Sequence, residues 1–171
     1  ETTGPNMVLL CVHAEGNDTW RKVIVENSDS VMIAVEKTPQ GGDDVPISTL
    51  EAELLGGTLR SNVQLALYRQ SSSEPTTDTA RWLTHRDVAL HHHVALDREA
   101  DFARLARFMR GEALGLVLCG GGSFGTAHLG VALALQERGY EFDFIGGTSV
   151  GAALAAAMAL NIPTPEIMDV C

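Results

Sequence analysis

The stretch CGGGSFGTAHLG, residues 119–130, has four glycines within six positions. It follows the apolar run ALGLVLC (113–119) and leads into a helix-like segment at 126–139. Together these form one strand–loop–helix unit. YEFDFIGG (140–147) and SVGAALAAAMALN (149–161) repeat the order of strand then helix. Strands that alternate with helices predict an α/β fold, with a parallel sheet and helical crossovers.

The first 111 residues indicate a separate, smaller α/β unit, and the expected domain division is 1–111 and 112–171. Ser48 and Glu51 have the spacing of a capping box, which predicts a helix that ends at Gly56. The apolar and turn patterns predict strands over 7–12, 30–36, 62–68 and 87–96, and helices over 48–56, 79–86 and 97–111.

Composition and charge argue against several classes of partner. Of the 171 residues 45% are apolar, enough for a packed core, and the net charge is -10. Such an acidic chain is a poor match for nucleic acid, and it disfavours purely electrostatic docking on anionic lipid while allowing apolar insertion. Three widely spaced cysteines favour a reducing, intracellular compartment. The start of the chain does not resemble a signal peptide, and the apolar stretch 145–162 is too short and too rich in small residues to predict a membrane span.

The glycines permit a dinucleotide-binding interpretation. Gly120, Gly122 and Gly125 match G-x-G-x-x-G between a predicted strand and a predicted helix. That fold also needs an acidic residue at the end of the next strand. The nearest candidate, Asp143, precedes the end of its strand, where it is poorly placed.

The end of that second strand carries a sharper pattern. Gly147, Thr148, Ser149, Val150 and Gly151 form G-x-S-x-G at a strand-to-helix junction, which is typical of a nucleophile elbow. The tight turn projects the serine hydroxyl above the sheet, and the helix N-terminus favours a developing anion.

An elbow and a glycine loop at neighbouring strand ends are more specific together than either is alone. A serine that cleaves esters needs backbone N–H donors for the tetrahedral oxyanion. A loop without side chains can point its amides into the site. The pair therefore favours a hydrolase over a nucleotide-binding fold.

At GGGSFG, AHLGVA and GTSVG the chain resembles the patatin-like phospholipases, most closely the branch related to neuropathy target esterase. The family pattern is GGGxRG, AHIGVL and GTSxG. The resemblance is strong over 80–160 and weaker over 7–68, which is similar to a small Rossmann-like region upstream of the catalytic domain. It implies that residues 112–171 are the N-terminal part of a truncated patatin-like domain, with a core related to the α/β-hydrolases.

The resemblance also implies a chemistry. In the family a serine–aspartate dyad hydrolyses acyl esters of phospholipids or lysophospholipids without a cofactor or metal. Carried over, Ser149 is the nucleophile, and the oxyanion loop is Gly120, Gly121, Gly122 and Gly125. The expected location is cytoplasmic or membrane-associated, with peripheral membrane contact through the lipid substrate.

Two departures from the family pattern matter. Phe124 occupies the position of the family's basic residue, and no D-G-[GA] motif follows Ser149. Asp169 precedes Val170 and does not fit that motif. The chain also begins with Glu1 rather than Met, so we expect a piece of a longer protein. The dyad aspartate is expected beyond residue 171, and this chain alone is expected to be inactive.

Other interpretations stay open. Phe124 favours an inactive patatin-like module that only binds lipid or a partner, and the dinucleotide-binding domain is a second alternative. His91–His93 is interpreted as packing rather than a metal site, and His128 as packing rather than the base of Ser149. Two further expectations are a buried, apolar Cys119 and a solvated helix face at the arginines Arg104, Arg107 and Arg110.

Overall fold

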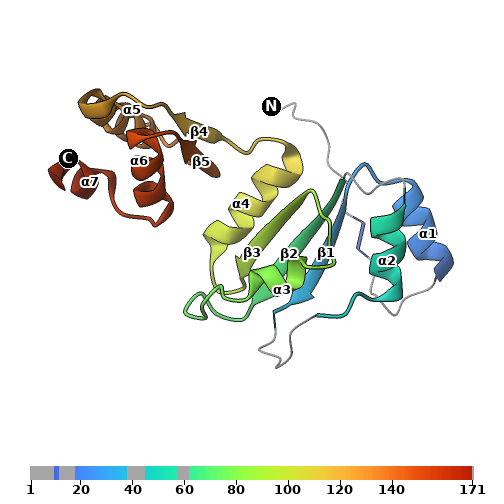
Figure 1. The fold of residues 1–171 in the computed structure, drawn as a ribbon. Helices are drawn as coiled ribbons and strands as arrows, with labels where there is room; N and C mark the ends of the chain where they lie inside the picture. The colour runs from blue at the N-terminus through green and yellow to red at the C-terminus, as the bar shows by residue number, and fades with distance from the viewer. Residues whose placement is uncertain (1–9, 12–17, 38–44, 58–61, 171) are drawn as a thin grey trace. The chain divides into compact units, whose positions relative to one another are not determined.

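The computed structural model describes residues 10–11, 18–37, 45–57 and 62–170. The chain divides into two compact units, Glu1–Leu105 and Ala106–Cys171, each with its own parallel sheet and its own core (Figure 1). The predicted α/β class with helical crossovers is confirmed. The division into domains at 111 and 112 stays a prediction.

Unit 1 is built on a three-stranded parallel sheet with the order β1-β2-β3. Leu65 of β2 pairs with Ile33 of β1 and with His91 of β3. Successive strands are connected through helices, and a further helix precedes the sheet. The strands are β1 (Val31–Glu36), β2 (Val63–Arg69) and β3 (Leu90–Ala95), and the helices are α1 (Asp18–Glu26), α2 (Thr49–Gly56), α3 (Thr79–Leu83) and α4 (Glu99–Arg110), which contains the division between the units.

The largest apolar cluster of unit 1 lies on one face of this sheet, whereas Ala66 and Val94, which are also buried, lie on the other face. Leu65, Leu67 and Trp82 are buried together, and Ile33 and Val35 pack against them. Alternate residues of a strand share a face, so Leu65 and Leu67 lie on the same side of β2. Since β2 is the central strand of the sheet, these two residues lie at the centre of the cluster. Trp82 comes from α3, so this helix covers the same face.

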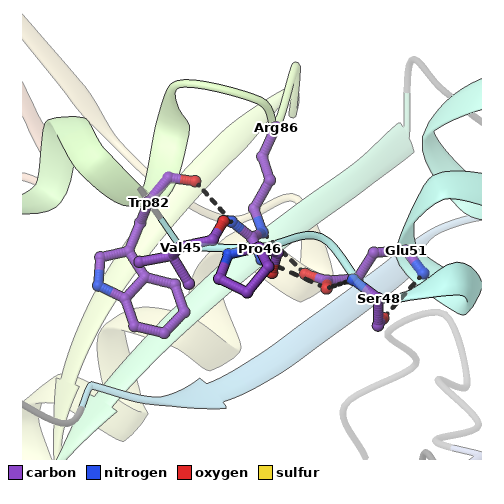
Figure 2. A network of polar contacts seen from close by, with 6 residues as sticks. All are labelled: Val45, Pro46, Ser48, Glu51, Trp82 and Arg86. Atoms are coloured by element: carbon purple, nitrogen blue, oxygen red, sulfur yellow. Dashed lines mark hydrogen bonds and ion pairs between the residues drawn. The ribbon is translucent and has the colours of Figure 1, made fainter. Parts of the chain in front are cut away.

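A buried ion pair lies beside this core (Figure 2). Arg86 is 3% exposed, and its Nε donates to Glu51 Oε1 at 2.8 Å and its Nη2 to Glu51 Oε2 at 3.3 Å. Arg86 also donates to the carbonyls of Val45, Pro46 and Trp82 at 2.9–3.2 Å. The guanidinium thus has acceptors for both terminal nitrogens and Nε, as a buried charge requires.

Glu51 serves two structures at once. Its carboxylate accepts from the Ser48 amide at 2.8 Å while its own amide donates to Ser48 Oγ, which confirms the predicted capping box at the start of α2. Burial alone would raise the pKa of Glu51, but the hydrogen bonds from Arg86 and Ser48 and the charge of Arg86 lower it below its usual value. The carboxylate therefore stays ionised and links α2 to the segment after α3.

The three histidines of β3 have different surroundings. His91 is exposed, His92 is buried with Nε2 2.9 Å from Gln64 Oε1, and His93 Nε2 lies 3.1 Å from Thr79 Oγ1. Burial, with repulsion from neighbouring positive groups, lowers the pKa of His92 and of His93 to about 4. Within the described ranges no three His, Cys, Asp or Glu side chains are grouped to hold a metal ion.

Unit 2 has two parallel strands joined through a helix. Leu118 of β4 pairs with Gly147 of β5. Its core combines residues of β4 and all three helices: Leu118, Leu129, Ala132, Leu154, Ala155, Met158 and Ile167. The elements are β4 (Gly115–Leu118), the 3-10 helix η2 (Gly122–Thr126), α5 (Ala127–Gln136), β5 (Phe144–Gly147), α6 (Val150–Ala159) and α7 (Thr164–Val170). None of the described helices has the length and apolar character needed to cross a bilayer.

Arg107 corrects the prediction of a solvated arginine face on α4. Its Nη2 lies 2.8 Å from Asp143 Oδ1 and its Nη1 2.8 Å from Glu141 Oε2. Asp143 is buried, and its Oδ2 also accepts from the Leu114 amide at 3.1 Å. The prediction was wrong because helix periodicity does not reveal a partner 36 residues away.

Two helices, α1 and α7, were not predicted. Pro165 is the second residue of α7, and a proline in the first turn is compatible with a helix because that N–H has no partner there. The predicted strand at 7–12 lies largely outside the described residues; Leu10 and Cys11 belong to neither helix nor strand.

Replacing Glu51 by glutamine should destabilise unit 1. Glu51→Gln keeps the shape but leaves Arg86 as an uncompensated buried charge, so we expect the free energy of unfolding to fall by about 3 kcal/mol. Urea denaturation measures it. The matched control is Glu26→Gln in the same unit, which breaks the exposed Lys22–Glu26 pair and should cost less than about 1 kcal/mol. Equal losses in both variants would contradict the role of the buried pair.

Unit 1 should lose stability as the pH falls from 6.5 towards 4. His92 and His93 have folded pKa values near 4 against an ordinary value of 6.5, so in this window the unfolded state binds more protons. The stability that comes from keeping these two histidines neutral is fully present above pH 6.5. Urea midpoints measured across this range should fall, and His92→Gln with His93→Gln should flatten the fall. A wild-type midpoint that does not change between pH 6.5 and 4.5 would contradict the prediction.

Candidate active site

Ser149 lies at the turn between β5 and α6. β5 ends at Gly147 and α6 begins at Val150. The side chain of Ser149 is exposed, and its backbone has φ 54° and ψ -129°. A positive φ is uncommon for a residue with a Cβ, and strained residues of this kind gather at functional sites. The G-x-S-x-G spacing predicted this position correctly, at the carboxyl end of a parallel strand.

Two glycines make this turn possible. A Cβ on Gly147 would lie 2.5 Å from the carbonyl carbon and oxygen of Gly151. A Cβ on Gly151 would collide with the Leu118 carbonyl oxygen and would lie 2.5 Å from the Cys119 oxygen. The obstacles are backbone atoms, which cannot rotate away. The turn therefore brings α6 directly against the end of β4.

The glycine loop reaches the same turn from the neighbouring strand. A Cβ on Gly120 would be 3.2 Å from Ser149 Cβ, so this glycine faces the serine closely. A Cβ on Gly125 would collide with Val150 Cγ1. Part of this loop is regular, because residues Gly122–Thr126 form the 3-10 helix η2. The structure thus brings the two motifs together at one end of the β4–β5 sheet.

The loop also presents backbone donors. Gly122 has φ 56°, the left-handed region that favours glycine. Among the hydrogen bonds of the described residues, none uses the amide of Gly121 or Gly122. In the first turn of α6 the amides of Ala152 and Ala153 donate to the Ser149 carbonyl, whereas the amides of Val150 and Gly151 have no acceptor among the described residues. This end of the sheet therefore carries N–H groups available to an anion.

His128 contacts the loop rather than the serine. Its Nε2 lies 3.0 Å from the Cys119 carbonyl oxygen and 3.4 Å from Cys119 Sγ. This supports the interpretation of His128 as a packing residue. Cys119 itself is exposed, which corrects the prediction of a buried cysteine: it follows the last residue of β4 instead of filling the core.

Ser149 has no base among the described residues. No hydrogen bond of the Ser149 hydroxyl is present within them, and Asp169 lies on the exposed side of α7. Asp143, the acid considered for a nucleotide ribose, binds Arg107 through both carboxylate oxygens. It comes before β5 rather than after it, so it does not fit the dinucleotide interpretation.

Phe124 is 85% exposed at the 3-10 turn. Its neighbour Gly125 packs on Val150, the residue after Ser149. An apolar ring is thus held in the open close to the serine turn. Sequence reasoning identified Phe124 as a missing cation but did not recognise it as an exposed apolar feature of the site.

The family model and the relatives described here agree with one another. Residues 116–171 match the family model described as patatin-like phospholipase. A patatin-like phospholipase domain-containing protein of Caenorhabditis elegans is 28% identical over 93% of this chain and 15% of its own length. Neuropathy target esterase sws is 31% identical in Drosophila persimilis and 29% in Drosophila melanogaster, each over 88% of this chain and 12% of the relative. The chain thus spans only a small part of these relatives, and no solved structure matches it.

Adjacent glycines of β5 give a sharp test of the turn. Gly147→Ala should strongly destabilise unit 2, because its Cβ has no space against Gly151. Gly146→Ala is the matched control, since nothing lies within 4 Å of a Cβ there. Urea denaturation and circular dichroism compare the two. Similar stabilities for both variants would contradict the close packing of the turn.

Proposed function

Because residues 116–171 are part of a patatin-like phospholipase domain, we propose that the whole protein is a serine hydrolase that cleaves acyl esters of phospholipids or lysophospholipids. The observation that carries the proposal is Ser149, held at positive φ between β5 and α6 and facing the glycine loop. The printed names of the relatives, an esterase and phospholipase-domain proteins, agree with an ester substrate.

The chemistry would proceed in two steps. Ser149 Oγ attacks the acyl carbonyl carbon while its proton passes to a carboxylate. The tetrahedral intermediate then collapses, the bond between the carbonyl carbon and the alcohol oxygen breaks, and that oxygen takes the proton back from the carboxylic acid, so that the alcohol leaves and an acyl-enzyme remains. Water then attacks this ester, frees the fatty acid and restores the serine. No carboxylate bonds to Ser149 within the described residues, so the aspartate of the proposed dyad comes from another part of the protein.

Charge that develops on the carbonyl oxygen needs donors fixed in advance. The amides of Gly121 and Gly122 are without partners in the described part of the chain, and Gly120 and Gly125 keep the loop against the serine turn. Donors aimed at an oxyanion contribute roughly 10²–10³-fold to such reactions. Gly147, Thr148, Val150 and Gly151 would act by holding the elbow rather than by touching the acyl group.

The lipid substrate would approach through apolar contact. The net charge of -10 opposes attraction to an anionic membrane, whereas Phe124 offers an exposed ring on the loop that packs against the serine turn. Peripheral contact with a lipid surface follows from this arrangement.

A second candidate function is an inactive module of the same fold that binds lipid or a protein partner. Phe124 supports it, because the family's basic residue is missing from the loop. A fluorophosphonate probe applied to the full-length protein separates the two functions, since only an activated serine is labelled. Absence of labelling would favour the inactive module.

Substitution of Ser149 tests the nucleophile. Ser149→Ala in the full-length protein should abolish fluorophosphonate labelling and hydrolysis of lysophospholipid, with little change in stability because the side chain is exposed. Ser149→Gly should be equally inactive but more stable than Ser149→Ala by about 1 kcal/mol, because glycine relieves the positive φ. The matched control is Ser123→Ala, an exposed serine of the glycine loop. Wild-type turnover by Ser149→Ala would mean that another residue is the nucleophile.

A further inference from the structure

Arg69 is a buried cation for which the described residues provide no hydrogen-bond acceptor at Nε or Nη1. It is the last residue of β2 and only 7% exposed. Its Nε and Nη1 are buried without a hydrogen bond, and within the described residues Arg69 forms no ion pair. Arg86 in the same unit shows the contrast, with acceptors on all three guanidinium nitrogens.

An unpaired buried charge is costly, and proteins rarely keep one. Removing a cation from water is unfavourable unless an anion or several acceptors replace the water. A buried polar group without a partner therefore calls for an explanation, and a missing ligand is one of them.

Lys37 lies on the same face of the sheet at the same end. Val35 pairs with Leu67, and the Lys37 amide donates to the Tyr68 carbonyl at 2.7 Å, so the pairing continues one residue past β1 and sets Lys37 opposite Arg69. Among the described residues the Lys37 ammonium has one long hydrogen bond, 3.5 Å to the Pro75 carbonyl oxygen. Two positive side chains therefore occupy adjacent strand ends.

His93 adds an independent observation on this face. It pairs with Leu67, and after burial and His91 the charges of Lys37 and Arg69 contribute to lowering its pKa, so both cations act on one imidazole. Its Nδ1 is buried and has no hydrogen bond, while its Nε2 meets Thr79. Unpaired polar atoms of Arg69 and His93 thus come from neighbouring strands.

Two described acidic side chains from the segments that follow β2 and β3 are already bonded elsewhere. Asp97 accepts from Ser71 and Ser72, and Glu74 accepts from the Ser71 amide. Lys37 and Arg69 lie at the carboxyl ends of parallel strands, the edge at which open α/β sheets bind their ligands.

We propose that Arg69 and Lys37 form a binding site for a phosphate group at the carboxyl edge of the β1-β2-β3 sheet. Two cations match a dianion, and the planar guanidinium fork matches phosphate oxygens. His93 Nδ1 can donate a third hydrogen bond in the tautomer whose Nε2 accepts from Thr79. The site belongs to unit 1 and does not depend on the chemistry proposed for Ser149.

Calorimetric titration of the full-length protein with inorganic phosphate tests the proposal, with acetate as the comparison anion. The wild type should bind phosphate more tightly than acetate. Arg69→Met and Lys37→Met should each weaken phosphate binding by about tenfold or more, the effect of losing a charge-assisted hydrogen bond. Arg98→Met is the matched control, since Arg98 is an exposed arginine of the same unit paired with Asp101, and it should bind as the wild type does.

Vesicles distinguish a free phosphate from a lipid headgroup. Arg69-dependent binding to phosphatidic acid vesicles, but not to phosphatidylcholine vesicles, would assign the phosphate to a headgroup. If Arg69→Met does not fold, Lys37→Met still tests the proposal, because Lys37 is only half-buried and its replacement should leave the fold intact. The proposal would be overturned if the wild-type protein bound neither phosphate nor phosphatidic acid. It would also be overturned if Lys37→Met, and any Arg69 variant that folds, bound phosphate with the affinity of the wild type.

Discussion

Close backbone contact between the β5–α6 turn and the end of β4 is the constraint on which unit 2 depends. Gly151 approaches the carbonyls of Leu118 and Cys119 so closely that a Cβ would collide. Gly147 approaches Gly151 in the same way. These contacts hold the N-terminus of α6 beside the sheet edge, and Ser149, in the turn between the two glycines, has a strained backbone with φ 54°. The position of the candidate nucleophile is thus a consequence of packing between main chains.

Unit 1 relies on a different physical solution. Its apolar cluster is small, and a charged network of Arg86, Glu51 and Ser48 joins α2 to the segment after α3. In this network every strong donor has an acceptor. By contrast, Nε and Nη1 of Arg69 in the same unit have no acceptor among the described residues. The same type of side chain therefore appears once as a completed structural link and once as an incomplete one, and this difference is what identifies Arg69 as a candidate ligand site.

Sequence reasoning succeeded where the pattern is local. The capping box at Ser48, the turn at Ser149 and the strands of both sheets follow from spacing of apolar residues and glycines. It failed where a distant partner decides. Arg107 was expected to face solvent, but Asp143 pairs with it, and Cys119 was expected in the core, but the end of β4 leaves it exposed. The dyad aspartate, the domain limits and the role of each glycine stay predictions.

The backbone of Ser149 also restricts which nucleophile this fold can use. Threonine carries the same hydroxyl, but a β-branched side chain at φ 54° is a severe steric outlier. Unbranched residues such as serine or cysteine are tolerated there at far lower cost. The backbone conformation of this turn therefore disfavours threonine and allows serine, whatever the reactivity of the two hydroxyl groups. Evolution of this site towards a threonine nucleophile would require a different turn, and with it a different contact between α6 and β4.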